Sequence, residues 1–152
     1  MQVAWTTISS DDLNHYLVAA QVSAMRSAAL GAGQADPFTE VMPTVIARIR
    51  AICSTNGKVI SATANSVPPE LKDIACYLIL EELQTRLPGL VLTDEQRRQT
   101  DNGRDYLKQI ARGDALVSDP LDPITPPVQQ GAPIKVITSR TRLATRDTLK
   151  GL

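Results

Sequence analysis

Few residues of this chain have the chemical character of a catalytic group. The 152 residues include one histidine, His15, and two cysteines, Cys53 and Cys76. A thiol nucleophile needs a nearby base and a lowered pKa, whereas both cysteines lie in apolar helical stretches, where burial raises the thiol pKa. We therefore expect two buried free thiols rather than a disulfide or a Cys–His pair, and we expect no enzymatic activity.

Metal and phosphate sites are not expected either. The acidic pairs at 11–12 and 81–82 are adjacent in sequence, and adjacent side chains on a helix point in different directions. The Gly-Ala-Gly at 31–33 lacks the preceding strand and the following lysine of a phosphate-binding loop. The sequence therefore predicts no catalytic, metal-binding or cofactor-binding residue.

The net charge is zero overall but unevenly distributed. Residues 135–152 hold five basic residues and one acidic residue, a net charge of +4, so residues 1–134 carry −4. A basic end suits docking onto an acidic partner, and the alternative is an ordinary tail that its charges keep hydrated.

No stretch approaches the roughly 20 apolar residues of a membrane span, and no signal segment is visible, so we expect synthesis in the cytoplasm.

Nucleic-acid binding is the main alternative to a structural role. Basic residues are frequent at 97–112 and again from 135 onward. The alternative function is therefore a small helical nucleic-acid-binding module that uses the fourth helix and the basic tail. Acidic residues interleave with the first group, however, and the tail has no aromatic residue to stack on bases.

Two helices are expected in the first third of the chain. The first begins after Ser9 or Ser10, and its apolar residues recur at helical spacing up to the glycines at 31–33. Trp5, before this helix, is expected to be an anchor folded back on the body. The second begins at 36–37 and follows an apolar stripe to the Asn-Gly at 56–57. Pro43 either kinks this helix or separates a first turn from it.

Two further helices follow a loop at 58–67, which has at most a short extended piece around Val59 and Ile60. The third helix starts at 68–70 and is apolar almost all round, so it should be the central one, ending at Pro-Gly 88–89. The fourth region starts at Thr93 and ends at Gly113. Its polar half, 94–105, is either helix or loop, and the residues able to reach the core are Tyr106, Leu107, Ile110 and Ala111.

The tail, residues 114–152, holds five of the ten prolines and none of the five aromatic residues, so it has no core of its own. The predicted fold is all-α, a four-helix bundle over 1–113 with an extended Pro-rich C-terminal arm over 114–152. The β-branched stretch 134–138 has no strand partner in the chain, which favours addition of a short β-strand to a partner's sheet. A hairpin with 141–149, packed on the bundle, is the alternative.

Two groups of residues are candidates for contacts with other proteins. In the arm, the partner-binding candidates are Ile134, Lys135, Val136, Ile137, Thr138, Ser139, Arg140, Arg142 and Arg146. On the polar surfaces of the second and fourth helices, the candidate subunit contacts are Arg48, Arg50, Arg97 and Arg98.

Two stretches carry a resemblance to a known family. Residues 67–77 contain the pattern VP..L..IA before and within the central helix, and residues 105–113 contain L..IA.G at the end of the last helix. In both stretches the chain resembles the Mu-like prophage head–tail adaptor family, related in fold to the head–tail connectors of other tailed phages. The resemblance covers about residues 8–117. The chain departs from the family pattern at 51–57 and in the longer Pro-rich extension.

The resemblance implies a structural protein of the virion neck, made in the host bacterial cytoplasm. Such proteins form a ring, commonly a dodecamer of identical copies, beneath the portal protein, and the C-terminal segment docks onto the portal. The ring extends the channel through which packaged DNA passes without sequence-specific binding. Its other face receives a further neck or tail-completion protein, so the resemblance predicts a link between capsid and tail.

Overall fold

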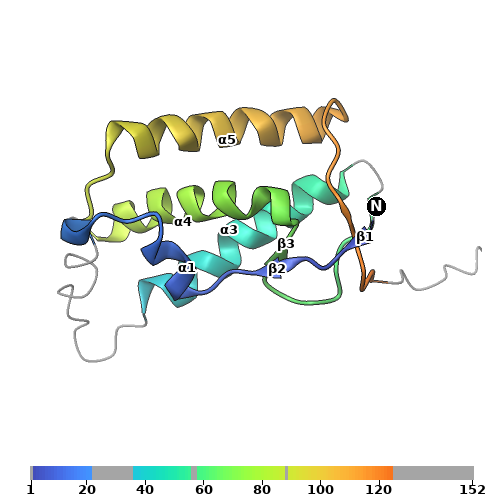
Figure 1. Ribbon diagram of the computed structural model, residues 1–152, viewed down its shortest axis with the longest axis horizontal. Coiled ribbons are helices and arrows are strands. Elements are labelled where there is room, and N and C mark those ends of the chain that lie inside the picture. The colour runs from blue at the N-terminus through green and yellow to red at the C-terminus, as the bar shows by residue number, and fades with distance from the viewer. Residues whose placement is uncertain (1, 22–35, 56–57, 88, 125–152) are drawn as a thin grey trace, which may run out of the picture.

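The computed structural model describes residues 2–21, 36–55, 58–87 and 89–124, and this part of the chain is mostly α-helical (Figure 1), as the sequence predicts. The long helices are α3 (Pro37–Ser54), α4 (Lys72–Arg86) and α5 (Asp94–Arg112). The short elements are β1 (Gln2–Val3), β2 (Thr6–Thr7), α1 (Ser10–Asn14), β3 (Ser66–Val67), the 3₁₀ turn η1 (Pro69–Leu71) and β4 (Asp119–Pro120).

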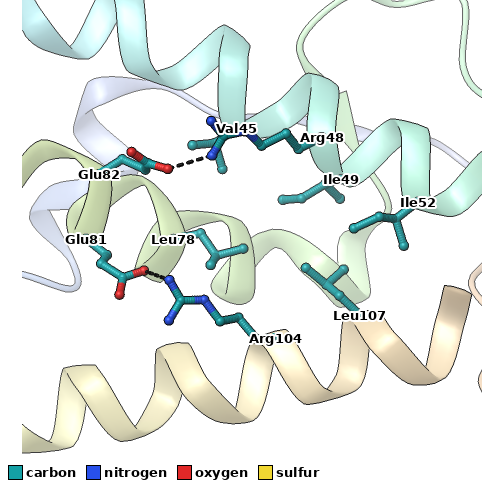
Figure 2. A pocket seen from close by; sticks show the side chains of 9 residues that line it. All are labelled: Val45, Arg48, Ile49, Ile52, Leu78, Glu81, Glu82, Arg104 and Leu107. Atoms are coloured by element: carbon teal, nitrogen blue, oxygen red, sulfur yellow. Dashed lines mark hydrogen bonds and ion pairs between the residues drawn. The ribbon is translucent and has the colours of Figure 1, made fainter.

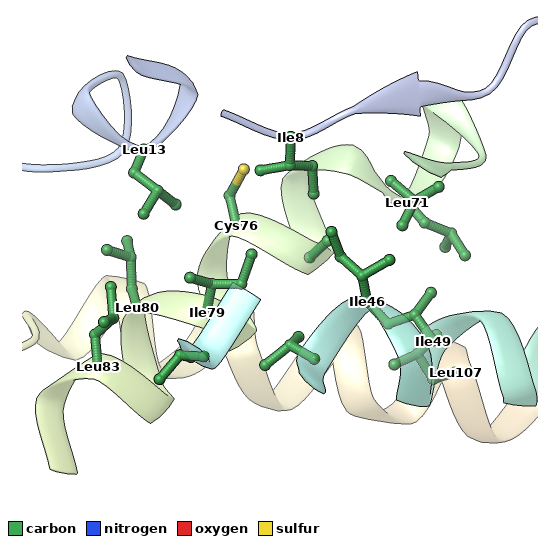
Figure 3. Packing of buried hydrophobic residues seen from close by; sticks show 14 of the residues in the cluster. Ile8, Leu13, Ile46, Ile49, Leu71, Cys76, Ile79, Leu80, Leu83 and Leu107 are labelled. Atoms are coloured by element: carbon green, nitrogen blue, oxygen red, sulfur yellow. The ribbon is translucent and has the colours of Figure 1, made fainter. Parts of the chain in front are cut away.

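Helix α4 is the central helix of the body, as its apolar composition predicts. It packs against both α3 and α5, and five of its side chains are fully buried: Ala75, Cys76, Ile79, Leu80 and Leu83. Figure 3 shows part of this core, with Ile46 and Ile49 from α3 and Leu107 from α5 among the residues that pack around α4. Each such aliphatic side chain contributes about 1.5–3 kcal/mol to folding by leaving water.

Local capping explains where α3 begins. The Asp36 carboxylate accepts the backbone N–H of Phe38 at 3.0 Å, and Pro37 occupies the first turn, where its missing N–H has no intrahelical partner to lose. Of the two alternatives for Pro43, a separate turn is the wrong one, because α3 runs as one helix from Pro37 to Ser54 with Pro43 inside it.

The first helix is shorter than predicted. Ser9 caps it with a capping box to Asp12, as its sequence indicates, but α1 ends at Asn14, and residues 15–18 leave the helical conformation. The reason is tertiary: the Tyr16 carbonyl accepts a hydrogen bond from the Gln96 amide of α5, which turns the chain toward that helix. Residues 19–21 are helical again, and the remainder of the predicted helix, from residue 22 to the glycines at 31–33, lies outside the described residues.

Helix α5 is continuous, so the polar stretch 94–105 is helix rather than loop. Thr93 forms a capping box with Gln96, and Gly113 ends the helix in the left-handed conformation with φ 84°. The expectation that only residues 106–111 reach the core is wrong. Gln96, Thr100 and Gly103 are buried in the polar half of α5, whereas Ala111 is exposed.

Burial of this polar stretch is possible because its polar groups find partners. The side-chain amides of Gln96 and Gln21 exchange hydrogen bonds at 2.8 and 3.1 Å, and the Thr100 hydroxyl donates to the Gln96 carbonyl. Gly103 allows close approach of α4, since a Cβ at this position would lie 2.8 Å from the Cγ2 atom of Ile74.

The first residues of the predicted arm, 114–124, pack on the body. β4 pairs in parallel with β1, and the Trp5 indole donates to the Ser118 carbonyl at 3.1 Å, which confirms Trp5 as an anchor. Residues 60–62 pair with 122–124 through the Ser61–Pro123 bridge, so the chain is extended near Ile60, as expected. Further along the same loop, β3 pairs with β2. The rest of the arm, 125–152, lies outside the described residues.

Candidate functional site

A groove runs between α3 and α5 with α4 beneath it (Figure 2). Its volume is about 190 Å³. The aliphatic lining comes from all three helices: Val45, Ile49 and Ile52 from α3, Leu78 from α4 and Leu107 from α5. Sequence reasoning did not find this groove, because no single helix contains it and its lining residues also form the apolar stripes of their own helices.

Two ion pairs form the rim of the groove. Arg48 of α3 binds Glu82 at 2.6 Å, and Arg104 of α5 binds Glu81 at 2.5 Å (Figure 2). The two adjacent glutamates of α4 therefore point toward different helices, as expected from their positions in sequence. Because all four side chains are partly exposed, each pair contributes about 0–1 kcal/mol to stability.

Arg50, which the sequence predicts to be solvated or to contact another subunit, has its guanidinium bound within the chain. It donates to the carbonyls of Ser61, Thr63 and Ser66 at 2.6–3.0 Å and to the Ser66 hydroxyl at 3.1 Å. It also lies 5.5 Å from the centre of the Trp5 ring. Arg50 therefore fixes the 61–66 loop against the N-terminal segment.

The surface of α5 carries the other two candidate arginines. Arg98 is exposed and pairs with Glu95 within its own helix, while Arg97 is exposed and has no ion-pair partner among the described residues. Lys108 pairs with Asp105, and Arg104 pairs with Asp101 as well as Glu81. Most cations of this helix are thus neutralised by neighbouring carboxylates, which weakens the case for α5 as a nucleic-acid surface.

The partner-binding candidates of the arm, Ile134 to Arg146, lie outside the described residues. The chain leading to them can be followed as far as Ile124, whose N–H donates to the Ile60 carbonyl at 2.8 Å. Asp122 holds this segment in place, because its carboxylate accepts hydrogen bonds from the hydroxyls of Thr63 and Ser61, and these bonds lower the pKa of the Asp122 carboxyl.

The exposed large apolar side chains lie on segments at the two ends of the body. At one end, the side-chain amide of Gln21 connects Val18 and Val91. Its oxygen accepts the Val18 backbone N–H, and its nitrogen donates to the Val91 carbonyl. At the other end, Leu116, Leu121, Val59 and Ile124 belong to the segments 113–124 and 58–61, which Lys58 and Asp119 join by an ion pair. Figure 1 shows segments 15–21 and 89–92 at the left end and segment 113–124 at the right end.

The residues with nucleophilic or basic character are the two cysteines and the histidine. Cys53 and Cys76 are buried free thiols, as predicted, and burial raises their thiol pKa values to about 11 and about 12. His15 is exposed at the C-terminal end of α1. Within the described residues there is no group of three or more side chains able to hold a metal ion.

A membrane-crossing helix is not found in the described residues, since none of their helices combines sufficient length with sufficient apolar character. Comparison of the chain with protein-family models, curated proteins and solved structures finds no match.

Proposed function

We propose that this chain is a head–tail adaptor of a tailed bacteriophage or prophage. In this proposal it is a non-enzymatic virion protein that forms a ring beneath the portal protein, extends the DNA channel and joins the capsid to the tail. The finer fold belongs to the same proposal: a fourth helix completes the bundle, and an arm beyond residue 124 docks onto the portal.

The observation that carries the proposal is the place of the family-like residues in the fold. Leu71, directly before α4, and Ala75 within it, both from the first resembling stretch, are fully buried in the core. Leu107 and Ile110, from the second stretch, are 6% and 3% exposed on the face of α5 that packs on α4. Residues that join two helices determine how those helices sit together, so the shared pattern supports a shared helix arrangement.

The two apolar ends of the body are a second, independent support. A neck adaptor has to bind one component above it and another below it, and each contact requires its own surface. Exposed apolar side chains that gather in two places mark interaction surfaces better than apolar residues scattered singly. Val18 and Val91 at one end, and Leu116 and Leu121 at the other, are exposed apolar side chains that two such surfaces could include.

The test is electron microscopy of particles produced when the gene carries an early stop codon. We expect filled or leaking heads that are separate from finished tails. Normal infectious particles would refute the proposal. The nucleic-acid alternative would then be pursued by measuring DNA binding against salt, since binding through phosphates weakens steeply as salt rises.

A matched pair of truncations tests the arm. Ending the chain after Ile124 removes the arm and should abolish attachment to the portal while the body stays folded. Ending it after Val117 also removes β4 and the Ser118 carbonyl that accepts the Trp5 indole, so this shorter chain should lose stability. Portal attachment by the chain that ends at Ile124 would contradict the proposed role of the arm.

A further inference from the structure

Residues 114–124, which we call the strap, follow α5 and cross the end of the body toward β1 (Figure 1). The buried residues of the strap are Val117 and Pro120. Its large apolar side chains remain in water, with exposures of 73% for Leu116, 59% for Leu121 and 42% for Ile124. A segment that buries so little apolar surface gains little from the hydrophobic effect, so the strap belongs to the least stable part of the described fold.

The strap is not packed closely against the helices beneath it. A cavity of about 290 Å³ lies between them, lined by Gly113, Ala115, Leu116 and Val117 on the strap side and by Cys53, Lys58 and Ile110 on the body side. Protein interiors are normally close-packed, and atoms that face a gap lose dispersion contacts. The strap therefore covers the ends of α3 and α5 without being locked onto them by packing.

Polar contacts hold the strap in its place instead. Besides the pairing of β4 with β1 and the bond from the Trp5 indole, three carboxylates act as anchors. Their bonds are Glu70 to the Ser118 hydroxyl, Asp119 to Lys58, and Asp122 to the hydroxyls of Ser61 and Thr63. All of these contacts are exposed or partly buried, so water can replace them when the strap leaves the body.

Gly113 provides a hinge between α5 and the strap. It is exposed and has a left-handed conformation, with φ 84°. A glycine enters and leaves this conformation at little steric cost, because it has no Cβ. The direction of the chain can therefore change at Gly113 while α5 keeps its hydrogen bonds.

We propose that the strap opens as a unit about Gly113 while α3, α4 and α5 stay folded, and that this opening uncovers Cys53. The inference goes beyond the adaptor proposal and does not depend on it. The chain after Ile124 is joined to the body through the strap, so a partner that displaces the strap also changes where the rest of the chain leaves the body. The device thus couples the position of the C-terminal chain to the exposure of a hidden thiol.

Alkylation of the native full-length chain tests this device, with the second cysteine as an internal control. Cys76 is buried in the core on α4 and does not line the cavity under the strap. While both thiols are covered they resist alkylation near pH 8, because burial raises their pKa values to about 11 for Cys53 and about 12 for Cys76.

We would add excess N-ethylmaleimide and follow each cysteine by mass spectrometry of the peptide that contains it. Cys53 should be labelled at least ~10-fold faster than Cys76, since strap opening exposes Cys53 alone and Cys76 waits for unfolding of the body. Equal rates for the two cysteines would overturn the proposal, because both would then be exposed by the same unfolding event.

Two substitutions loosen the strap at different anchors. Asp122→Ala removes the bonds to Ser61 and Thr63, and Ser118→Ala removes the bond to Glu70 but keeps the carbonyl that the Trp5 indole binds. Each should raise the Cys53 rate at least ~3-fold, the change expected from the loss of one hydrogen bond, and leave the Cys76 rate unchanged.

The matched control is Asp101→Ala, which also removes an exposed carboxylate but lies on α5 outside the strap and its cavity. It should change neither rate. Cys53 and Cys76 rates that rise together in the strap variants would overturn the proposal, since the strap would then unfold only with the body. Faster labelling in Asp122→Ala but not in Ser118→Ala would overturn it in favour of a loosened loop after α3, and unchanged Cys53 rates in both variants would also overturn it.

Discussion

Replacing Arg50 by methionine should destabilise the protein far more than the same change at Arg48, two residues earlier on α3. Arg50 makes four hydrogen bonds to the 61–66 loop and lies against Trp5, whereas Arg48 makes one exposed ion pair with Glu82. Methionine keeps most of the apolar stem of the side chain in both cases, so the comparison isolates the guanidinium contacts.

The magnitude follows from the number and exposure of these contacts. A hydrogen bond to a charged donor contributes about 1.5–3 kcal/mol, and a cation–π contact contributes about 0.5–2 kcal/mol. The four bonds share one half-buried side chain, and water can replace part of what is lost. We therefore expect Arg50→Met to lower the free energy of unfolding by about 3 kcal/mol, against about 0–1 kcal/mol for Arg48→Met.

Urea unfolding followed by circular dichroism measures both values. For a chain of this length, a loss of about 3 kcal/mol corresponds to a fall in Tm of about 6–12 °C. Arg50→Lys should recover only a minor part, because an ammonium group cannot reach several carbonyls at once as the planar guanidinium does. If Arg50→Met and Arg48→Met agree within ~0.5 kcal/mol, the role assigned to Arg50 is refuted.

Three further predictions concern the packing and the charges of the body. Gly103→Ala places a Cβ 2.8 Å from Cγ2 of Ile74, so overpacking of about 1–3 kcal/mol should outweigh the ~1 kcal/mol gain in helix propensity. In an Ile74→Ala background the same change should become stabilising, and a double-mutant cycle by urea unfolding that lacks this change of sign would contradict the tight α4–α5 contact. A hydrogen bond from Lys72, aided by Ser9, lowers the pKa of Asp12 from 3.8 to about 2. The carboxylate's contribution to stability is therefore complete above pH ~4 and is lost as the pH falls toward 2, so Asp12→Asn should flatten the stability profile in that window; an unchanged profile would argue against the ion pair. Ile79→Asp should unfold the body, because it buries an unpaired charge in α4, and retention of the native circular dichroism spectrum would refute that burial.

Much of the helical framework could be predicted because its signals are local. Ser9, Asp36 and Thr93 supply side-chain caps within three residues of the N–H groups that they bind, and Gly113 supplies the left-handed residue that ends α5. Burial of α4 followed from its composition, since a helix that is apolar on most sides has to be covered on most sides.

The errors arose where contacts between distant residues decided the structure. The length of α1 depends on a bond between Tyr16 and Gln96, and the burial of Gln96 depends on an amide partner at Gln21. A polar residue counts as a surface residue in any local pattern, yet it is stable inside the protein once its hydrogen bonds are satisfied. The sequence pattern contains no sign of that pairing.

The sequence by itself determined where α1, α3 and α5 begin, where α5 ends, the central place of α4 and the buried free thiols, because capping and apolar periodicity act over a few residues. Only the tertiary structure decided the packing of residues 114–124, the inward role of Arg50 and the groove between α3, α4 and α5. Arg50 meets carbonyls 11 to 16 residues further along the chain, and the Trp5 indole meets a carbonyl 113 residues away. Such contacts exist only after the helices have packed, and so the surfaces on which function depends are set at that step.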